Sequence, residues 1–539
     1  MRQWRRSSRL CFRTISEYAD RSACGFVKRS WSEFLQASIT GQSSASGRSD
    51  AAIKRADERT LRRIMENVEI TSSNGTLRFA ALVAAVCGGL YGYDTGIISG
   101  ALLSMTDEFG LSHHMQEIVA SAILAGAVIG ALATSWLSER IGRKITVLVV
   151  AAVFAIGAVA CSLAPTVPLL VAGRLLLGIA VGASTQVVPM YISELAPPDR
   201  RGNLVTMFNV AIGIGILLAN IVGVTLHNVW TWRPMVAIAA VPAMVVCVAM
   251  IFMPRSPRWV AENRGLEPAA EILGQVRDTH RDVQAELRQI QEIAREAKPE
   301  ESGWRGIRQS WVRPALLAAL GVAFFTQCGG LEMMIYYAPT FLEDAGFGRS
   351  SALYASLGVG AVYALATLLG CLFVDRIGRR RLMLIMIPGS VISLIGLGAM
   401  FATGATQGPA SWLTIVFLLA FMLFNSGGIQ VCGWLLGSEM FPLAMRGPAT
   451  ALHAAMLWGS NLIVTGTALS LVQAAGLGST MWIYAGINFA SFLFVYLFVP
   501  ETAGVSLEDI EEALRQGDFR PRQGDSGLTR RAGVAAVPA

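Results

Sequence analysis

SELAPPDRRG, which runs from Ser193 to Gly202, returns later in the chain as SEMFPLAMRG, from Ser438 to Gly447. A second pair of motifs, ERIGRK at Glu139–Lys144 and DRIGRR at Asp375–Arg380, recurs in the same order and at almost the same offset. Each member of this second pair joins two long apolar stretches through a very short charged turn. Two motif pairs in one order predict a membrane protein built from two parallel internal repeats.

The composition argues against a soluble fold. Of the 539 residues, 53% are hydrophobic and only 15% are charged, and the mean hydropathy is +0.51, whereas globular domains carry about 25% charged residues. We expect an all-α membrane protein with twelve transmembrane helices in two parallel six-helix repeats, an arrangement typical of two-halved secondary transporters. The expected helices are 78–103, 116–138, 145–164, 167–192, 203–225, 233–253, 315–340, 352–373, 382–402, 412–436, 448–472 and 480–499.

Lysine and arginine residues fall on one side of this topology. They are frequent in the turns at 139–144, 197–202 and 375–381, in segment 254–313 and in both tails, and scarce in the intervening loops. By the positive-inside rule the first set is cytoplasmic, so we expect both termini of a multi-pass membrane protein to lie inside. The pI near 9.1 then reflects topology and contact with membrane lipid, and no nucleic-acid partner is expected.

The apolar runs divide the chain into five segments. Residues 77–253 and 314–499 are the two six-helix halves, 254–313 is a cytoplasmic linker, 500–539 is a cytoplasmic tail, and 1–76 precedes the first helix. Apolar residues at helical spacing among charges predict amphipathic helices in the linker, against the cytoplasmic face. They are Leu273, Val276, Val283, Leu287, Ile290 and Ile293.

The two ends of the chain differ in what they predict. SLEDIEEALRQ at Ser506–Gln516 carries a helix-cap signature followed by an amphipathic turn or two. Residues 1–64 are rich in arginine and serine and lack the apolar core of a secretory signal. Three interpretations stay open for this segment: a basic disordered tail, a start set upstream of Met65, and an organelle transit peptide. We favour the first two.

The sequence gives no indication of a cofactor, a metal site or a disulfide framework. Six of the eight cysteines lie inside apolar runs and none forms a C-x-x-C pair, so we interpret them as core residues. His113 and His114 are adjacent in an expected outer loop, but no carboxylate or thiol stands at ligand spacing. We therefore expect neither a cofactor nor a metal.

Two ionisable residues lie deep within the expected helices. Asp94 falls in the first helix and Arg174 about one turn into the fourth. Charges inside transmembrane helices are costly and normally functional, so this pair predicts a proton relay. The alternatives are a purely structural ion pair and an aspartate wetted near the surface.

Eight motifs stand in order along most of the chain. They are GYDTGIISGALL at Gly92, GRLLLGIAVG at Gly173, PMYISELAPPDRRGNLV at Pro189, PRSPRWV at Pro254, YYAPTF at Tyr336, DRIGRR at Asp375, GWLLGSEMFP at Gly433 and PETAGVSLEDI at Pro500. Over about 77–515 the chain thereby resembles the sugar porters of the major facilitator superfamily, which include the bacterial proton-coupled xylose symporter and the animal glucose facilitators. The resemblance implies the major facilitator fold and transport by alternating access.

The resemblance also implies an inner gate, a cluster of charges at the cytoplasmic helix ends that clamps the two halves together when the protein faces outward. The alternative for any single arginine is a solvated topology determinant. For Glu194 and Glu439 it is less favoured, because burial at the membrane edge is costly without a partner. The expected gate residues are Glu139, Arg140, Arg143, Glu194, Arg201, Asp375, Arg376, Arg379, Glu439 and Arg446.

In the xylose symporter, the resemblance places a proton-binding aspartate and its modulating arginine at the positions of Asp94 and Arg174. The animal facilitators carry no carboxylate at the Asp94 position. Retention of both residues therefore favours proton symport over uniport.

The expected substrate pocket departs from the family pattern. The family's seventh helix reads Q-Q-x-x-G-x-N-x-x-x-Y-Y, whereas this chain reads TQCGGLEMMIYY, with Thr326 for the first glutamine and Glu332 for the asparagine. The Gly-Pro hinge before the retained tryptophan of the tenth helix becomes Gln430-Val431. The candidate substrate-binding residues are Asn209, Thr326, Gln327, Glu332, Tyr336 and Trp434.

Glu332 is the sharpest of these changes. In the pocket it would accept hydrogen bonds from vicinal hydroxyls, attract an amine-bearing substrate, or titrate as a second coupling site. Alternatively it points away and pairs with an arginine of an outer loop. Because a site built for particular hydroxyls rejects analogues strongly, the identity of the sugar does not carry over from the family.

The sequence as a whole predicts a proton symporter for a sugar or polyol, acting as a monomer. The rivals are a uniporter of the same fold and a non-transporting nutrient sensor, although the tail after Gln516 is short for a signalling segment. An intramembrane enzyme is disfavoured, because no nucleophile and base, metal-spaced cluster or phosphate-binding loop stands out.

Overall fold

The computed structural model describes residues 64–65, 68, 73–226, 231–296, 301, 303–406 and 408–520. Within these ranges the chain is helical and contains no β-strand, and twelve helical spans are long and apolar enough to cross a membrane. The predicted fold class is thus confirmed. The expected N-terminal extension lies, apart from a few residues, outside the described ranges, as does most of the C-terminal tail.

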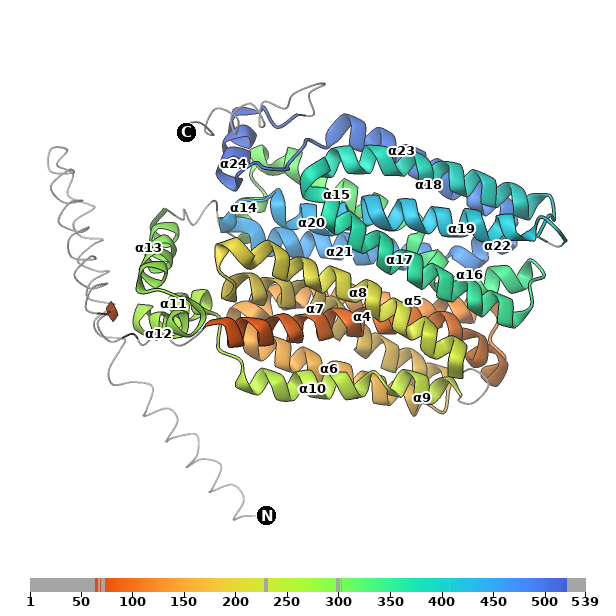
Figure 1. Ribbon diagram of the computed structural model, residues 1–539, viewed down its shortest axis with the longest axis horizontal. Coiled ribbons are helices and arrows are strands. Elements are labelled where there is room, and N and C mark those ends of the chain that lie inside the picture. The colour runs from red at the N-terminus through yellow and green to blue at the C-terminus, as the bar shows by residue number, and fades with distance from the viewer. Residues whose placement is uncertain are drawn as a thin grey trace, which may run out of the picture. The chain divides into compact units, whose positions relative to one another are not determined.

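The first half of the bundle, called the N half below (Figure 1), has six spans among the described residues. Its sixth span is divided into a short and a longer helix by a turn at 238–239. The helices are α4 (Ser73–Phe109), α5 (His113–Ile141), α6 (Arg143–Ser162), α7 (Val167–Leu195), α8 (Pro198–Leu226), α9 (Trp232–Ala237) and α10 (Ala240–Phe252).

The second half, the C half, also has six spans, but three of them are interrupted. Its helices are α15 (Arg313–Cys328), α16 (Leu331–Asp344), α17 (Arg349–Ile377), α18 (Arg379–Ala402), α19 (Ser411–Asn425), the π-helix η2 (Ser426–Gln430), α20 (Val431–Glu439), α21 (Arg446–Thr465), α22 (Ala468–Ala475) and α23 (Leu477–Phe498). Short 3₁₀ turns, η1 (Ser310–Val312) and η3 (Leu443–Met445), precede α15 and α21.

The seventh span shows why such interruptions escape a hydropathy pattern. The expected continuous helix 315–340 breaks between α15 and α16, where Gly330 adopts a left-handed backbone with φ of +91°. Glycine reaches this region without steric cost. The apolar pattern continues across the break, so only the glycine pair signals it.

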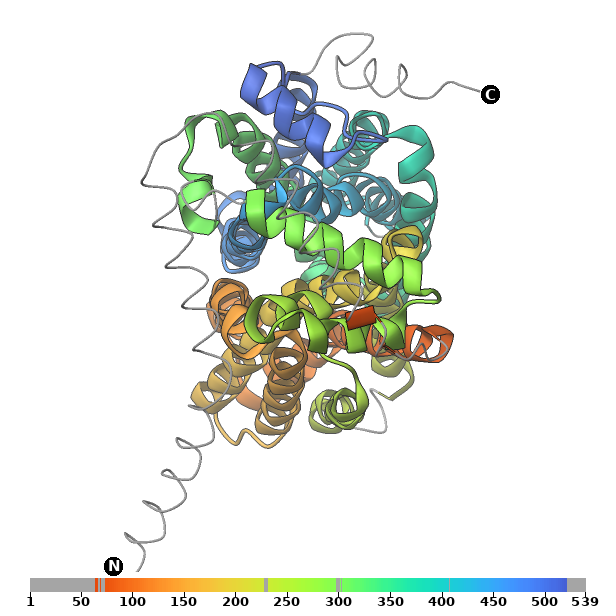
Figure 2. The same cartoon turned by 90° about the vertical axis from the view of Figure 1, so that its left-hand side faces the viewer.

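The segment between the halves folds into four helices at one end of the bundle, called here the linker end; the end with α9 and α22 is the far end (Figures 1 and 2). Of the six apolar residues expected on these helices, Leu273, Val276, Val283 and Leu287 are buried and Ile290 is half-buried, whereas the side chain of Ile293 lies outside the described part of the chain. The helices are α11 (Pro257–Arg264), α12 (Leu266–Val276), α13 (His280–Glu296) and α14 (Gly303–Ile307).

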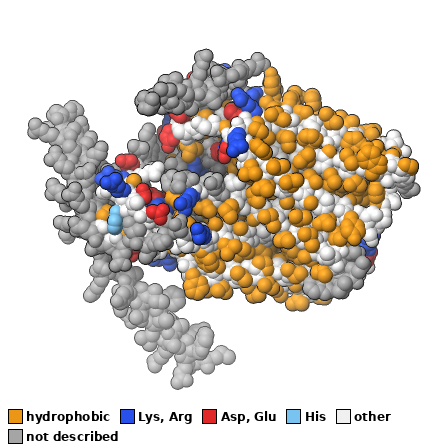
Figure 3. Space-filling view, in the orientation of Figure 1, with side chains coloured by type: hydrophobic (Ala, Val, Ile, Leu, Met, Phe, Trp, Pro, Cys, Tyr) orange, Lys and Arg blue, Asp and Glu red, His pale blue; other side chains and the backbone are white. Residues whose placement is uncertain are grey.

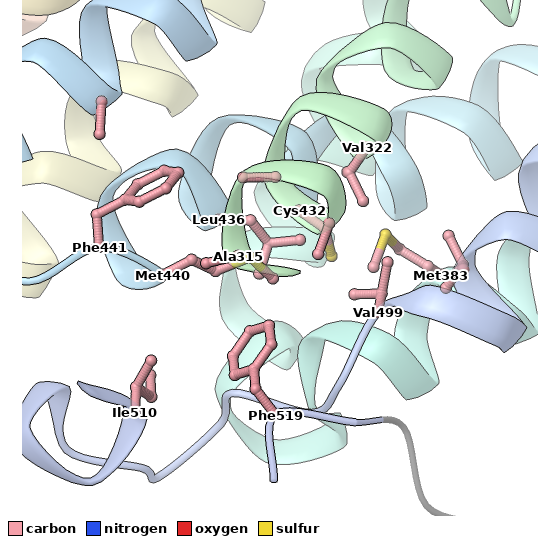
Figure 4. Packing of buried hydrophobic residues seen from close by; sticks show 14 of the residues in the cluster. Ala315, Val322, Met383, Cys432, Leu436, Met440, Phe441, Val499, Ile510 and Phe519 are labelled. Atoms are coloured by element: carbon pink, nitrogen blue, oxygen red, sulfur yellow. The ribbon is translucent and has the colours of Figure 1, made fainter. Parts of the chain in front are cut away.

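The predicted C-terminal helix is also present, as α24 (Leu507–Gln516), and the side chain of Ser506 caps it. Arg515 on α24 lies 2.5 Å from Glu301 of the linker, and this hydrogen bond raises the pKa of Arg515. Ile510 and Phe519 pack with Cys432, Leu436 and other residues of the C half into one apolar cluster (Figure 4). The tail after the last span is therefore part of the fold as far as residue 520.

The lateral surface of the spans is apolar, whereas charged side chains gather at the linker end (Figure 3). On the lateral surface of the spans, large apolar side chains such as Phe252, Ile156 and Ile392 are more than half exposed. A membrane environment covers such a surface, since a soluble monomer rarely exposes apolar patches of this extent.

Candidate functional site

A buried polar group lies where the two halves meet, in helices whose outer faces are apolar. Glu332 in the first turn of α16 is only 1% exposed, and its Oε2 atom has no hydrogen-bond partner among the described residues. The carboxylate interacts electrostatically with the hydroxyls of Tyr91, Tyr336 and Tyr363. Glu332 therefore lies in the interior near these tyrosines, and among the described residues it makes no ion pair with an arginine of an outer loop.

The break at Gly330 positions this carboxylate. Because α16 begins at Leu331, Glu332 occupies the first turn, where backbone N–H groups lack partners within the helix and the helix dipole favours a negative charge. A helix terminus in the middle of a transmembrane bundle is a common setting for polar ligand groups in transporters. The left-handed glycine thus converts an apolar span into a polar site.

Three aromatic rings from both halves meet beside this group. Tyr91 of α4 lies 6.4 Å from Trp434 of α20 and 5.3 Å from Trp458 of α21, measured between ring centroids. Trp434 and Trp458 are 6.0 Å apart. The Nε1 atom of Trp458 is buried and has no acceptor among the described residues. Aromatic faces of this kind stack on the apolar faces of sugar and polyol rings, and the free indole N–H is a donor for a hydroxyl.

The other predicted pocket residues divide into those with free polar atoms and those without. Gln327 is 2% exposed, and its Oε1 atom has no partner. Thr326 is not available in the same way, because its hydroxyl donates to the carbonyl of Val322 on its own helix at 2.7 Å. Tyr336 is buried and interacts with Thr95 of the N half, whereas Asn209 on α8 is half-buried with no described side-chain bond.

Asp94 and Arg174 are both buried, at 3% and 2% exposure, but they do not form a direct ion pair in this structure. Arg174 donates instead to two backbone carbonyls of α5, from Nε to Val119 at 2.6 Å and from Nη2 to Ala120 at 3.4 Å. One carboxylate oxygen of Asp94, Oδ2, has no partner among the described residues. Arg174 is thus bound to α5, and one carboxylate oxygen of Asp94 has no partner among the described residues.

At the linker end of the N half, the predicted gate charges form a compact network. Arg143 contacts Glu194 at 3.1 Å, and Ser256 of the linker donates to the same carboxylate. Trp259 donates to the backbone carbonyl of Glu139 at 2.7 Å. The exposed Arg140 lies over the ring of Trp136, 4.2 Å from its centroid.

The C half repeats this arrangement. Arg379 lies 2.8 Å from Glu439 and 2.6 Å from Asp375, and Thr502 after the last span also donates to Glu439. Arg446 lines a small cavity with Arg379 and Glu439, with a volume of about 240 Å³. Arg376 is exposed, and the side chain of Arg201 lies outside the described part of the chain.

Among the described residues at this end no ion pair joins the N half to the C half, so the structure does not show the direct charge clamp expected between halves. Glu139 of the N half approaches Gly447 of the C half at this end: a Cβ added at Gly447 would lie 3.7 Å from the carboxylate of Glu139. Gln186 of α7 also reaches the backbone of α21. The halves therefore touch here through single polar contacts, beside two internally paired clusters.

At the far end the two halves are joined by contacts that the sequence did not indicate. Glu117 of α5, 1% exposed, accepts hydrogen bonds from the backbone N–H of Ser470 at 2.7 Å and from its hydroxyl at 2.6 Å, in the first turn of α22. Arg349 of α17 lies 2.7 Å from Asp107 of α4. The only sequence signal for Glu117 was an acid at the edge of an apolar run.

Metal chemistry finds no support in the part of the chain that the structure describes. That part contains no group of three His, Cys, Asp or Glu side chains able to hold an ion. His113 and His114 make other contacts: His113 pairs with Gln473 at 2.7 Å and His114 lies 3.6 Å from Glu117.

Comparison with known proteins agrees with this geometry. A family model described as sugar (and other) transporter matches residues 80–514. The chain is 40% identical to the putative metabolite transport protein YwtG of Bacillus subtilis, over 82% of this chain and 95% of that protein. It is 35% identical to the major myo-inositol transporter IolT of the same organism, over 84% of this chain and 97% of the relative.

A solved structure gives the same fold. The chain is similar to the major facilitator superfamily proton:xylose symporter XylE of E. coli bound to 6-bromo-6-deoxy-D-glucose, with a TM-score of 0.70 at 28% identity. The similarity covers 82% of this chain and all of that chain.

Proposed function

The chain belongs to the family of sugar and other transporters, and from this premise we propose that it carries a sugar or polyol across the membrane together with a proton, by alternating access. It is a multi-pass membrane transporter, not an enzyme. The observation that carries the proton part of the proposal is Asp94, an acid that is 3% exposed and has one oxygen without a partner.

Asp94 is suited to bind the transported proton. An ionised carboxylate in a transmembrane helix is costly without a partner, and a proton relieves that cost. An ionised Asp94 would also compete with the carbonyls of Val119 and Ala120 for Arg174. Protonation would release the arginine to α5, and the bonds of Arg174 to these carbonyls support this proposal. The proton thereby changes how α4, α7 and α5 are held together.

The substrate would lie in the C half, beside Glu332. The carboxyl oxygen without a partner there calls for a hydrogen-bond donor, and hydroxyl groups of a sugar or polyol supply one. Trp434, Tyr91 and Trp458 offer rings for the apolar face of such a molecule. The named relatives XylE and IolT transport xylose and myo-inositol, so our proposal for this chain includes both sugars and polyols as substrates.

The contacts at the two ends of the bundle supply the gates. We assign the linker end to the cytoplasm on the positive-inside rule. The bonds of Glu117 to Ser470 and of Asp107 to Arg349 would open when the pocket faces outward. The contacts of Glu139 and Gln186 with α21 would open when it faces inward. Binding of substrate and proton together would permit the change between the outward-facing and inward-facing states.

Uptake into proteoliposomes tests the proposal. Purified protein is reconstituted, and uptake of labelled D-xylose, L-arabinose, D-glucose, myo-inositol and glucosamine is followed with and without an inward proton gradient. We expect at least one neutral sugar or polyol to accumulate above its outside concentration only when the gradient is present. Equilibration without accumulation would identify a uniporter. Absence of uptake of every probe would contradict transport of this substrate class.

A further inference from the structure

Gln430 occupies an unusual position in the fold. It ends the π-helix η2 that interrupts the tenth span, where the family pattern has a glycine. Single π-helical turns inside α-helices occur frequently at functional sites. The side chain is 2% exposed, so an amide has been placed in the interior, where the family has no side chain.

The amide of Gln430 is only half satisfied. Its Nε2 atom lies 3.5 Å from the hydroxyl of Tyr363 on α17, and its Oε1 atom has no partner among the described residues. If the amide were rotated, the nitrogen would be the atom left over, so one polar atom is free in either orientation. Buried polar atoms in folded proteins are almost always paired, by protein, water or ligand.

Tyr363 connects this amide with the pocket proposed around Glu332. It is 3% exposed and interacts electrostatically with Glu332, whose Oε2 atom also lacks a partner. The helix α17, which carries Tyr363, packs against both α16, which carries Glu332, and η2, which carries Gln430. A carboxylate oxygen can only accept a hydrogen bond, whereas the free atom of an amide accepts one if it is the oxygen and donates one if it is the nitrogen. Hydroxyl groups satisfy both positions at once.

Tyr363 also touches the opposite half. A Cβ added at Gly213 of α8 would lie 3.4 Å from Cδ1 of Tyr363, so the ring packs on the backbone of that helix. The helix α17 that carries Tyr363 packs along α8. A ligand that binds the tyrosine hydroxyl is therefore bound at the interface between the halves, where its presence can influence their relative movement.

We propose that Gln430 and Tyr363 form a second arm of the substrate pocket, opposite Glu332, and that this arm and the carboxylate together bind two adjacent hydroxyl groups of a sugar or cyclic polyol. The inference rests on the proposed function and makes it more specific. It assigns recognition to two residues in place of Thr326, whose hydroxyl is bound to its own helix. The class of ligand is one with a vicinal diol, as opposed to one recognised through a ring oxygen or a single hydroxyl.

Hydroxyl-deletion analogues test this arm. Tritiated D-glucose, D-xylose and myo-inositol are tested for binding to the purified parent, and the tightest binder is displaced by each of its monodeoxy analogues. The same series is measured for Gln430→Ala and Tyr363→Phe, with Gln473→Ala, an exposed glutamine at the far end, as the matched control. Thermal unfolding of each variant confirms that it folds. If Gln430→Ala does not fold, Tyr363→Phe, which removes one oxygen atom, carries the test alone.

We expect two analogues lacking adjacent hydroxyls to bind the parent and the control about tenfold more weakly than the intact probe. Tyr363→Phe and Gln430→Ala should bind the intact probe more weakly than the parent does. In these variants one of the two analogues should bind as tightly as the intact probe, because the hydroxyl that it lacks no longer has a partner. If both variants show the same losses as the parent for every analogue, the arm is wrong while the transport proposal stands. If none of the three probes binds the parent, the proposed function fails, and the arm fails with it.

Discussion

The two halves descend from one repeat pattern, yet they pack their helices differently. In the N half the closest glycine approaches are to backbone: a Cβ at Gly178 or Gly182 would lie 1.9 or 2.0 Å from a carbonyl oxygen of α5. In the C half the corresponding close approaches are to side chains, such as Gly389 to Phe424 and Gly396 to Phe417, both at 2.4 Å. Backbones in contact cannot yield, whereas aromatic rings can rotate.

The same contrast appears in helix continuity. Among the described residues, the C half interrupts its seventh, tenth and eleventh spans, whereas the N half interrupts only its sixth. The breaks at Gly330 and at η2 are where Glu332 and Gln430 lie. We infer from this difference that the tightly packed N half holds the proposed proton site in fixed geometry, while the more adaptable C half supplies most of the proposed substrate pocket.

The largest expected effect comes from the proton site of the N half. Asp94→Asn should abolish accumulation against a gradient while leaving substrate counterflow largely intact, because it removes the proton carrier and spares the C half. Uptake and counterflow in proteoliposomes measure the two separately, and Glu108→Gln on the same helix, 38% exposed at its side chain, is the control. A variant that still concentrates substrate would show that coupling lies elsewhere.

The packing contrast gives the next largest effect. Gly182→Ala forces α5 and α7 apart and should lower the free energy of unfolding by about 1–3 kcal/mol, the usual cost of overpacking. Gly396→Ala meets a phenylalanine ring and should cost less. Thermal or denaturant unfolding of the purified proteins compares them. Equal losses in the two variants would remove the distinction between the halves.

In the C half, Glu332→Asn should change specificity without changing coupling. Loss of a hydrogen bond to a charged group costs about 1.5–3 kcal/mol, so affinity for the native substrate should fall roughly tenfold or more. An ordinary hexose or pentose should gain relative to it, since asparagine is the residue of the family pattern. Competition assays across the sugar panel give the answer, and an unchanged profile would mean that Glu332 does not contact substrate.

A smaller effect is expected where the halves meet at the far end. Glu117→Ala removes both hydrogen bonds to Ser470, so amide exchange in α22 should become several-fold faster. The Glu108→Gln variant breaks contacts only within the N half and should leave α22 unaffected. Unchanged exchange in Glu117→Ala would show that this contact does not hold the halves together.

The sequence predicted the duplication, the twelve spans and the linker helices because each depends on local pattern. It also identified Glu332 and the exchange at Gln430 as departures from the family. It did not predict that Arg174 binds carbonyls of α5, that Thr326 bonds its own helix, or that the amide of Gln430 lies 3.5 Å from the hydroxyl of Tyr363. Those facts depend on contacts between helices, which hydropathy and motif spacing do not encode.

Proton movement during transport tests the central claim most directly. Proteoliposomes containing the parent protein enclose a pH-sensitive dye, and the substrate identified by the uptake panel is added outside with no initial pH gradient. Proton symport predicts that the lumen acidifies as substrate enters, and that Asp94→Asn shows counterflow without acidification. Substrate entry with no change of luminal pH in the parent would contradict coupling and leave a uniporter.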